Sequence, residues 1–295
     1  MNLRQIGLVG YGEVGSIFGA GLKQQPGVTG VSAWDLKFSD LAARARAVEG
    51  GIAAQDSMAQ LCANADLVIS AVTASNTLAV AEEAAAHLRA GSFFLDLNSA
   101  SPGTKRKAAA LIDKVGAHYV EAGVMTSVPP YGIKVPMLLG GAQAEALAVA
   151  LNAWGMDAKA VSDRLGVASA IKMSRSVMIK GLEALVIESY ATARAYGVEA
   201  HVLPTLVETF PSIDWERQGA YFFSRVVQHG KRRAEEMREA ANTVREAGFE
   251  PWMSTAAADK QQWVADQAAG GLFRDLPPDA PWQDYADRLL AARKR

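Results

Sequence analysis

Two lysines and a serine recur at four-residue spacing in the second half of the chain and could move a proton. Lys172, Ser176 and Lys180 stand at i, i+4 and i+8, so on a helix they share one face. A lysine in a desolvated cleft can have its pKa lowered towards neutrality. Hydride transfer at a carbinol needs one such group to take or return the hydroxyl proton. On the sequence alone, a solvated surface position is the simpler interpretation for each lysine.

A glycine-rich segment near the N-terminus has the pattern of a dinucleotide-binding turn. Gly10, Gly12 and Gly15 form G-x-G-x-x-G directly after the apolar run Gln5–Val9. The first glycine permits a tight turn, the second lets the backbone approach a pyrophosphate, and the third lets helix pack on strand. The N-terminus of the helix that follows attracts phosphates through its N–H groups and dipole. The residues expected to line the cofactor between these glycines are Tyr11, Glu13 and Val14.

An acidic residue follows the second apolar segment, Val28–Trp34. Asp35 lies 20 positions after Gly15 (35 − 15), which is the distance expected for a ribose-binding carboxylate. Such a carboxylate hydrogen-bonds the 2′-OH and repels a 2′-phosphate, so it favours NAD over NADP. Lys37 could soften that preference and admit NADP, although a solvated surface charge is the preferred interpretation of this lysine.

Composition bounds the functional class. The chain has 295 residues, half of them apolar, which is enough for two domains. A net charge of −1 gives no reason to expect nucleic acid or a membrane as a partner. Cys62 is the sole cysteine, so an internal disulfide is excluded and a reducing, cytoplasmic setting fits. No apolar run is long enough to span a bilayer, and the spacing of the four histidines gives little support to a metal site.

The first half of the chain alternates short apolar runs with helix-like segments. Because such alternation produces a parallel sheet covered on both faces, it predicts an α/β doubly wound sheet of the Rossmann type. The expected strands are Gln5–Val9, Val28–Trp34, Asp66–Val72, Ser92–Leu97, His118–Ala122 and a further segment at Pro136–Leu139. The expected helices between them include Ser39–Val48, Thr77–Leu88 and Lys105–Lys114.

The pattern becomes helical after about Asp163. The segment Asp163–Tyr196 contains no proline and would form a helix about 50 Å long at about 1.5 Å per residue. We therefore expect a dinucleotide-binding domain at residues 1–163, followed by an all-α domain at residues 164–295 that this long helix links to the first. The other helices expected there are Leu203–Thr209, Gly219–Glu246, Ser254–Gln267 and Trp282–Arg293.

Two polar stretches follow expected strands, at the edge where doubly wound sheets bind their ligands. Asn98 and Ser99 could hydrogen-bond a ligand there or only build a turn, whereas Ser101-Pro102 is typical of an N-cap and first helical turn. Thr126 and Ser127 follow the strand His118–Ala122 and could present two hydroxyls and backbone N–H groups. A polar loop without a ligand is the alternative for this second stretch.

Four segments lie in the order and spacing of the four motifs of the β-hydroxyacid dehydrogenase family, which this chain resembles over nearly its whole length. They are Gly7–Gly15, Asp96–Pro102, Glu121–Ser127 and Gly166–Ser176. The family includes 3-hydroxyisobutyrate, tartronate semialdehyde and 6-phosphogluconate dehydrogenases. The later runs Val177–Leu185 and His229–Met237 resemble a divergent branch that carries a C-terminal domain of unknown function.

The resemblance implies an NAD(P)-dependent dehydrogenase acting on a small hydroxy acid or related carbinol. Lys172 matches the family's catalytic lysine, and Ser176 stands where an asparagine is common. Ser99, or Asn98 beside it, would contact substrate. Val72 and Thr73 would pass near the cofactor. The family also implies a homodimer built through helical domains, which the apolar, methionine- and alanine-rich helix Ala168–Ala195 supports.

Departures from the family pattern leave the substrate and some alternatives open. A Gly-Gly pair that binds the substrate carboxylate in the family reads Thr126-Ser127 here, which implies a differently shaped substrate. The additional candidates for contact with an anionic group are Arg175, Lys180, His229 and Arg232. Imine reductases share the architecture but usually lack a lysine at the position of Lys172. Oxidative decarboxylation and a cofactor-binding protein without turnover are the remaining alternatives.

Overall fold

A computed structural model describes residues 3–277 and 279–292 of the chain. The chain divides into two compact units, Met1–Met173 and Ser174–Arg295. The division falls inside helix α7 (Val167–Tyr196), ten residues after the domain boundary expected at residues 163/164 (173 − 163). The first turns of α7, with Lys172, therefore belong to the first unit.

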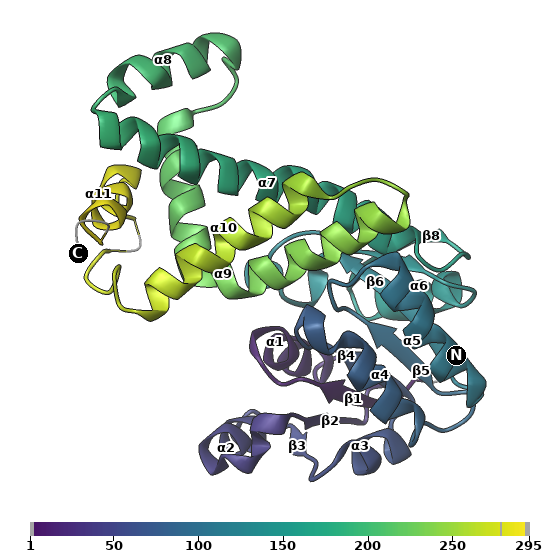
Figure 1. Ribbon diagram of the computed structural model, residues 1–295. Coiled ribbons are helices and arrows are strands. Elements are labelled where there is room, and N and C mark those ends of the chain that lie inside the picture. Colours follow the sequence, from purple (N-terminus) through teal and green to yellow (C-terminus); the bar gives the residue numbers. More distant parts are fainter. Residues whose placement is uncertain (1–2, 278, 293–295) are drawn as a thin grey trace. The chain divides into compact units, whose positions relative to one another are not determined.

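The first unit is built on a mostly parallel sheet, as predicted (Figure 1). The order of its strands is β3-β2-β1-β4-β5-β6-β7-β8, and the pairing of β6 with β7 is the antiparallel one. This pair departs from the predicted parallel arrangement, because the connection between β6 and β7 is too short for a crossover. The strands are β1 Gln5–Val9, β2 Gly30–Trp34, β3 Ala53–Ala54, β4 Leu67–Ser70, β5 Phe93–Asp96, β6 His118–Val124, β7 Pro136–Gly140 and β8 Asp157–Ser162.

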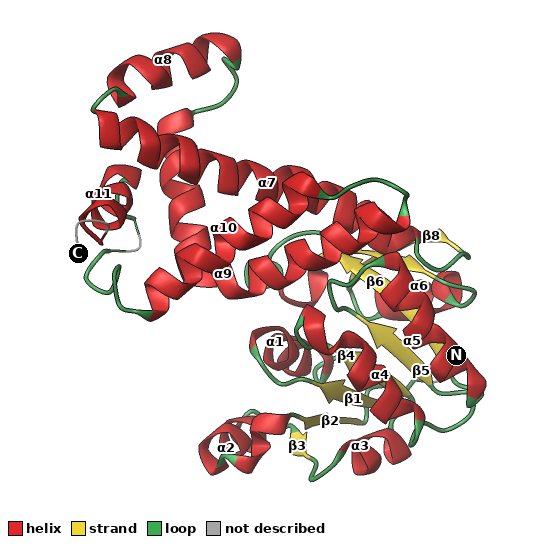
Figure 2. Cartoon of the chain, viewed as in Figure 1, coloured by secondary structure: helices red, strands yellow, loops and turns green. Residues whose placement is uncertain are grey.

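Helices pack on both faces of this sheet (Figure 2). One face is covered by α1, α2 and α6, and the other by α3, α4 and α5. Cys62 is buried in α3. These helices are α1 Glu13–Leu22, α2 Leu41–Glu49, α3 Met58–Asn64, α4 Thr77–Ala85, α5 Pro102–Lys114 and α6 Ala144–Ala153.

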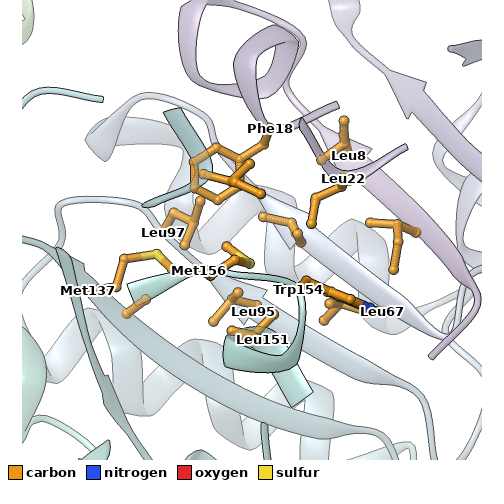
Figure 3. Close-up of a cluster of buried hydrophobic side chains, with 14 of the residues drawn as sticks. Leu8, Phe18, Leu22, Leu67, Leu95, Leu97, Met137, Leu151, Trp154 and Met156 are labelled. Carbon is orange, nitrogen blue, oxygen red and sulfur yellow. The ribbon is translucent and has the colours of Figure 1, made fainter. Parts of the chain in front are cut away.

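The core of the first face joins strands and helices that are far apart in the sequence (Figure 3). Leu8 of β1 and Leu95 of β5 are fully buried, as are Phe18 of α1 and Leu151 of α6. Strands buried on both faces read as continuous apolar runs. This is why the positions of β1, β4 and β5 could be predicted from hydrophobicity.

The second unit is helical, as predicted. Helices α9 and α10 run side by side as a hairpin joined by residues 247–251 (Figure 1), and Tyr190 and Phe223 are fully buried in the core of the unit. Within residues 3–277 and 279–292, every helix is too short or too polar to span a membrane. Besides the rest of α7, the helices are α8 Glu199–Thr209, α9 Trp215–Glu246, α10 Trp252–Ala269 and α11 Trp282–Ala292. Arg293, the expected end of the last helix, lies outside the described residues.

The long helix starts later than its sequence pattern predicts. It begins at Val167 rather than at Asp163, because Gly166 has φ +97° and this left-handed conformation does not belong to a right-handed helix. The edge strand β8, Asp157–Ser162, precedes the expected start of this helix. Gly181, in contrast, is accommodated within the helix.

Candidate active site

The carboxyl ends of β1 and β4 meet at the point where the order of strands reverses. Gly10 has φ +87°, and a Cβ atom on it would lie 2.6 Å from the Ala71 carbonyl oxygen and 2.9 Å from Val72 Cγ1. The glycine therefore permits both the turn and the close approach of β4. This edge is the topological switch point, where doubly wound sheets bind their ligands.

The other two glycines of the motif have different surroundings. A Cβ atom on Gly15 would lie 2.0 Å from the Gly10 carbonyl oxygen, so the missing side chain lets α1 approach the backbone of the turn. Gly15 was expected to let the helix pack on the strand, and the contact that it permits is with this turn instead. A Cβ atom on Gly12 would meet nothing within 4 Å. Gly12 is also the N-cap of α1 and offers no capping side chain. An open, side-chain-free helix N-terminus is the cradle that a phosphate requires.

Asp35 links the glycine turn to the end of β2. Its Oδ2 accepts the Tyr11 N–H at 2.7 Å and its Oδ1 accepts the Lys37 N–H at 2.8 Å. Each carboxylate oxygen has two lone pairs, so both can accept a further bond from a ribose hydroxyl. The Tyr11 ring lies 5.9 Å from the Phe38 ring, centroid to centroid, and burial raises the pKa of Tyr11 above 10.

Asn98 ties the carboxyl ends of β4 and β5 together. Its Oδ1 accepts the Val72 N–H at 2.7 Å, and its Nδ2 donates to Ser70 Oγ at 2.9 Å. The side chain is 3% exposed, and its amide is engaged on both sides with the protein itself. Ser99, the next residue, is half-buried. Ser101 Oγ accepts the Thr104 N–H at 3.2 Å, which confirms the predicted N-cap of α5.

A buried ion pair lies under this turn and was not predicted from the sequence. Lys105 Nζ lies 2.9 Å from Asp96 Oδ1 and donates to the Asp96 carbonyl oxygen at 3.0 Å. The Tyr119 hydroxyl donates to Asp96 Oδ2 at 2.6 Å. Burial, together with the Asp96 charge, raises the pKa of Tyr119 well above 10. Because Asp96 Oδ1 also accepts the Asn98 N–H at 2.9 Å, the pair fixes the turn that carries Ser99.

Lys172 lies against the carboxyl end of β6. A Cβ atom on Gly123 would lie 3.4 Å from Lys172 Cβ and 3.1 Å from the Ala168 carbonyl oxygen, so the missing side chain at Gly123 is what lets α7 approach. Lys172 itself is half-buried. Thr126 and Ser127, a few residues further along the same segment, are exposed.

The remaining sequence-predicted residues have simpler surroundings. Glu13 and Thr73 are exposed near the glycine turn, and Val14 is half-buried against the first core. In the second unit, Arg175 is exposed and Ser176 is buried. Lys180 is buried and forms an ion pair with Glu236 of α9. It lies on the same helix face as Ser176, as the four-residue spacing predicts, but the interpretation of Lys180 as a solvated surface lysine is wrong, because its charge is buried against Glu236.

Two family profiles match the chain. One is described as the NAD binding domain of 6-phosphogluconate dehydrogenase and matches residues 5–153. The other is described as a domain of unknown function (DUF1932) and matches residues 193–264. Because the first match covers half of the chain, the chain belongs to this dehydrogenase family, and its first unit is an NAD(P)-binding domain. It is an NAD(P)-dependent oxidoreductase of the branch that carries the uncharacterised helical domain.

Solved structures share the fold of this chain. A conserved hypothetical protein from Sinorhizobium meliloti is 40% identical, with 100% of this chain and 97% of that chain covered and a TM-score of 0.77. A conserved protein of unknown function, described as structurally similar to 3-hydroxyacid dehydrogenases, is 30% identical over 90% of this chain and 99% of its own, with a TM-score of 0.67. A 3-hydroxyisobutyrate dehydrogenase from Salmonella typhimurium shares the fold at 17% identity, with 91% and 95% covered and a TM-score of 0.67.

Proposed function

We propose that this chain is an NAD-dependent dehydrogenase that transfers a hydride between the nicotinamide and a small hydroxy acid or related carbinol. The observation that carries the proposal is the packing of Lys172 against Gly123 at the carboxyl end of β6. The lysine thus belongs to the same unit as the glycine turn. The experiment that tests it is the replacement of Lys172, which should abolish turnover.

The residues around the glycine turn fit a dinucleotide. Gly12 leaves open the space that a side chain would fill, and α1 begins there with no side-chain cap, so the pyrophosphate has both room and a positive helix end. Val72 packs against Gly10 at the other side of the switch point. The bound cofactor supplies the hydride acceptor or donor, and Asp35 holds its adenosine ribose.

Lys172 is proposed as the general acid and base. During oxidation the neutral Nζ takes the hydroxyl proton as the carbinol hydrogen leaves as hydride, and during reduction the ammonium returns a proton to the carbonyl oxygen. Ser176 lies one turn further along α7, where its hydroxyl can orient the lysine or the substrate. Arg175, three residues after Lys172 and exposed, would contact an anionic substrate group.

Ser99 and the Thr126-Ser127 pair are proposed to contact the substrate. The buried ion pair beneath Ser99 holds its turn in place, whereas the Asn98 amide is engaged between β4 and β5. We therefore assign substrate contact to Ser99 and the support of its turn to Asn98. Threonine and serine in place of the family's two glycines add bulk and hydroxyl groups, so a substrate of a different shape with an additional polar group is favoured.

The carboxylate of Asp35 predicts a preference for NADH over NADPH. We expect NADH to bind about 10-fold more tightly than NADPH, or about 1.4 kcal/mol, because a 2′-phosphate would approach a carboxylate. In Asp35→Asn the ratio should fall to about 1, since the charge is lost. Fluorescence titration with both cofactors measures this, and Asp40→Asn is the matched control because Asp40 caps α2 in the same way. Equal affinity for both cofactors in the unaltered protein would contradict the assignment.

We also propose that the chain forms a homodimer through α7. Ile171, Met178 and Leu185 recur every seven residues on this helix and are 40%, 73% and 56% exposed, which is the spacing of a helix-packing seam. Light scattering at micromolar concentration should give twice the chain mass of 31.3 kDa. The double variant Met178→Lys/Leu185→Lys should give the mass of one chain. A monomer in the unaltered protein would overturn the proposal.

A further inference from the structure

Glu121 connects β6 to the start of the helix that carries Lys172. The side chain is fully buried, and its Oε1 accepts the Gly166 N–H at 2.8 Å and the Ala168 N–H at 3.1 Å. Gly166 immediately precedes α7 and Ala168 lies in its first turn, where backbone N–H groups have no intrahelical acceptor. A carboxylate from a strand therefore caps the N-terminus of the helix, and its negative charge interacts favourably with the positive end of the helix dipole.

The neighbouring strand is shaped to receive this carboxylate. Gly140 of β7 pairs with Glu121 in the sheet register, and a Cβ atom on Gly140 would lie 2.5 Å from Glu121 Oε1. Any larger residue at that position would displace the carboxylate. Glu121 Oε2 is also buried and has no hydrogen-bond partner among the described residues, so the side chain is held by Oε1 alone.

Gly123 makes the second contact between β6 and the same turn of helix. Residues 121 and 123 point to one face of the strand, and Gly123 admits both the Ala168 carbonyl and Lys172 Cβ. Lys172 follows Ala168 by four residues, which is one helical turn. The Ala168 N–H and the Lys172 Cβ are thus both positioned from β6.

The turn that carries Ser99 leads into a helix that packs against Gly166. A Cβ atom on Gly166 would lie 2.7 Å from Arg106 Nη1 and 3.2 Å from Pro102 Cβ, so the first turn of α5 packs on the residue that Glu121 holds. Pro102 follows the turn of Ser99 by three residues. Movement of Gly166 would therefore shift Lys172 and disturb the support of Ser99 together.

We infer that Glu121 is a positioning residue for Lys172, acting through the hydrogen bonds from Gly166 and Ala168 rather than through contact with substrate. The inference rests on the proposed function, in which Lys172 exchanges the proton. Lys172 must stand within hydrogen-bond reach of the substrate hydroxyl, and a displacement of about 1 Å can cost about 100-fold in rate.

Three variants of the full chain separate the hydrogen bonds from the charge. Glu121→Gln keeps an acceptor at the position of Oε1 and puts its amide nitrogen where Oε2 has no partner, so it should behave like the unaltered protein. Glu121→Ala removes the acceptor. Asp214→Ala is the matched control, because Asp214 caps α9 through the Arg217 N–H at 3.1 Å and belongs to the second unit.

The first readout is amide hydrogen exchange, which needs no substrate. In Glu121→Ala the amides of residues 167–172 should exchange at least about 10-fold faster, while those of α9 and α10 stay unchanged. Glu121→Gln should match the unaltered protein, and Asp214→Ala should show faster exchange only at the start of α9. Unchanged exchange at residues 167–172 in Glu121→Ala would overturn the inference.

The second readout is the division of the effect between kcat and KM for a 3-hydroxy acid that the unaltered protein oxidises. Glu121→Ala should lower kcat about 10- to 100-fold with KM and NADH affinity within about 3-fold, and Glu121→Gln should restore kcat to within about 3-fold. A glutamine variant as slow as the alanine variant would overturn the inference. Failure of the proposed function is distinguishable, because Lys172→Met would then keep its activity whatever Glu121→Ala does to hydrogen exchange.

Discussion

Replacing Lys172 with methionine should lower kcat for hydroxy-acid oxidation by about 100- to 10,000-fold, because the variant has no group to take the hydroxyl proton. Methionine keeps the unbranched stem that packs against Gly123, so the approach of α7 to β6 should be preserved. The affinity for NADH should be unchanged, since the glycine turn is separate from this contact. Steady-state kinetics with saturating NAD, together with a fluorescence titration of NADH, measure both quantities.

The control for this variant is Lys107→Met. Lys107 is an exposed lysine of α5, so the same change of side chain there should leave kcat within about 2-fold, as is usual for surface substitutions. If Lys172→Met retains full kcat while binding NADH normally, Lys172 is not the proton-exchanging group. Loss of NADH binding in the same variant would instead indicate that the replacement disturbs the first unit as a whole.

Replacing Gly12 with valine should reduce NADH affinity by about 100-fold, or about 3 kcal/mol, without destabilising the fold. A Cβ atom at this position would meet nothing within 4 Å in the protein, and the backbone there is extended, which suits a β-branched residue. The space it would fill is the space that the pyrophosphate needs. Fluorescence titration measures the affinity, and thermal unfolding should show a Tm within about 3 °C of the unaltered protein.

Gly15→Ala is the comparison variant, because Gly15 belongs to the same motif but has no space for a side chain. A Cβ atom on Gly15 would lie 2.0 Å from the Gly10 carbonyl oxygen, so even one methyl group must push the turn apart. Overpacking of this kind costs about 1–3 kcal/mol or more, so Gly15→Ala should lower both Tm and NADH affinity. If Gly12→Val bound NADH normally, the open space at Gly12 would not be the phosphate cradle.

The sheet was largely predictable because buried parallel strands leave a continuous apolar signature. Six segments were expected as strands, and each overlaps a strand in the structure. β3 was missed because it is two residues long. β8 was missed because most of its residues are exposed or partly buried and include Asp157 and Lys159, as suits a strand at the edge of the sheet. The antiparallel direction of β7 depends on the length of a loop, which hydrophobicity does not encode.

The candidate site was predictable only where its residues are close in the sequence. The glycine turn and Asp35 follow from spacing, because one strand–turn–helix unit positions them. The contacts that hold Lys172 could not be read in this way, since Glu121 reaches residues 45 and 47 positions away. Lys105 likewise looks, in the sequence, like an ordinary helix lysine. Only its burial against Asp96 shows that the pair supports the turn of Ser99.

The most direct test of the proposed chemistry is NADH formation from a panel of 3-hydroxy acids, with cyclic imines assayed in the reducing direction and Lys172→Met measured beside the unaltered protein. The account predicts that at least one hydroxy acid reduces NAD, that NADP serves less well, and that Lys172→Met abolishes the reaction. Reduction of cyclic imines alone, at the same rate in both proteins, would contradict it.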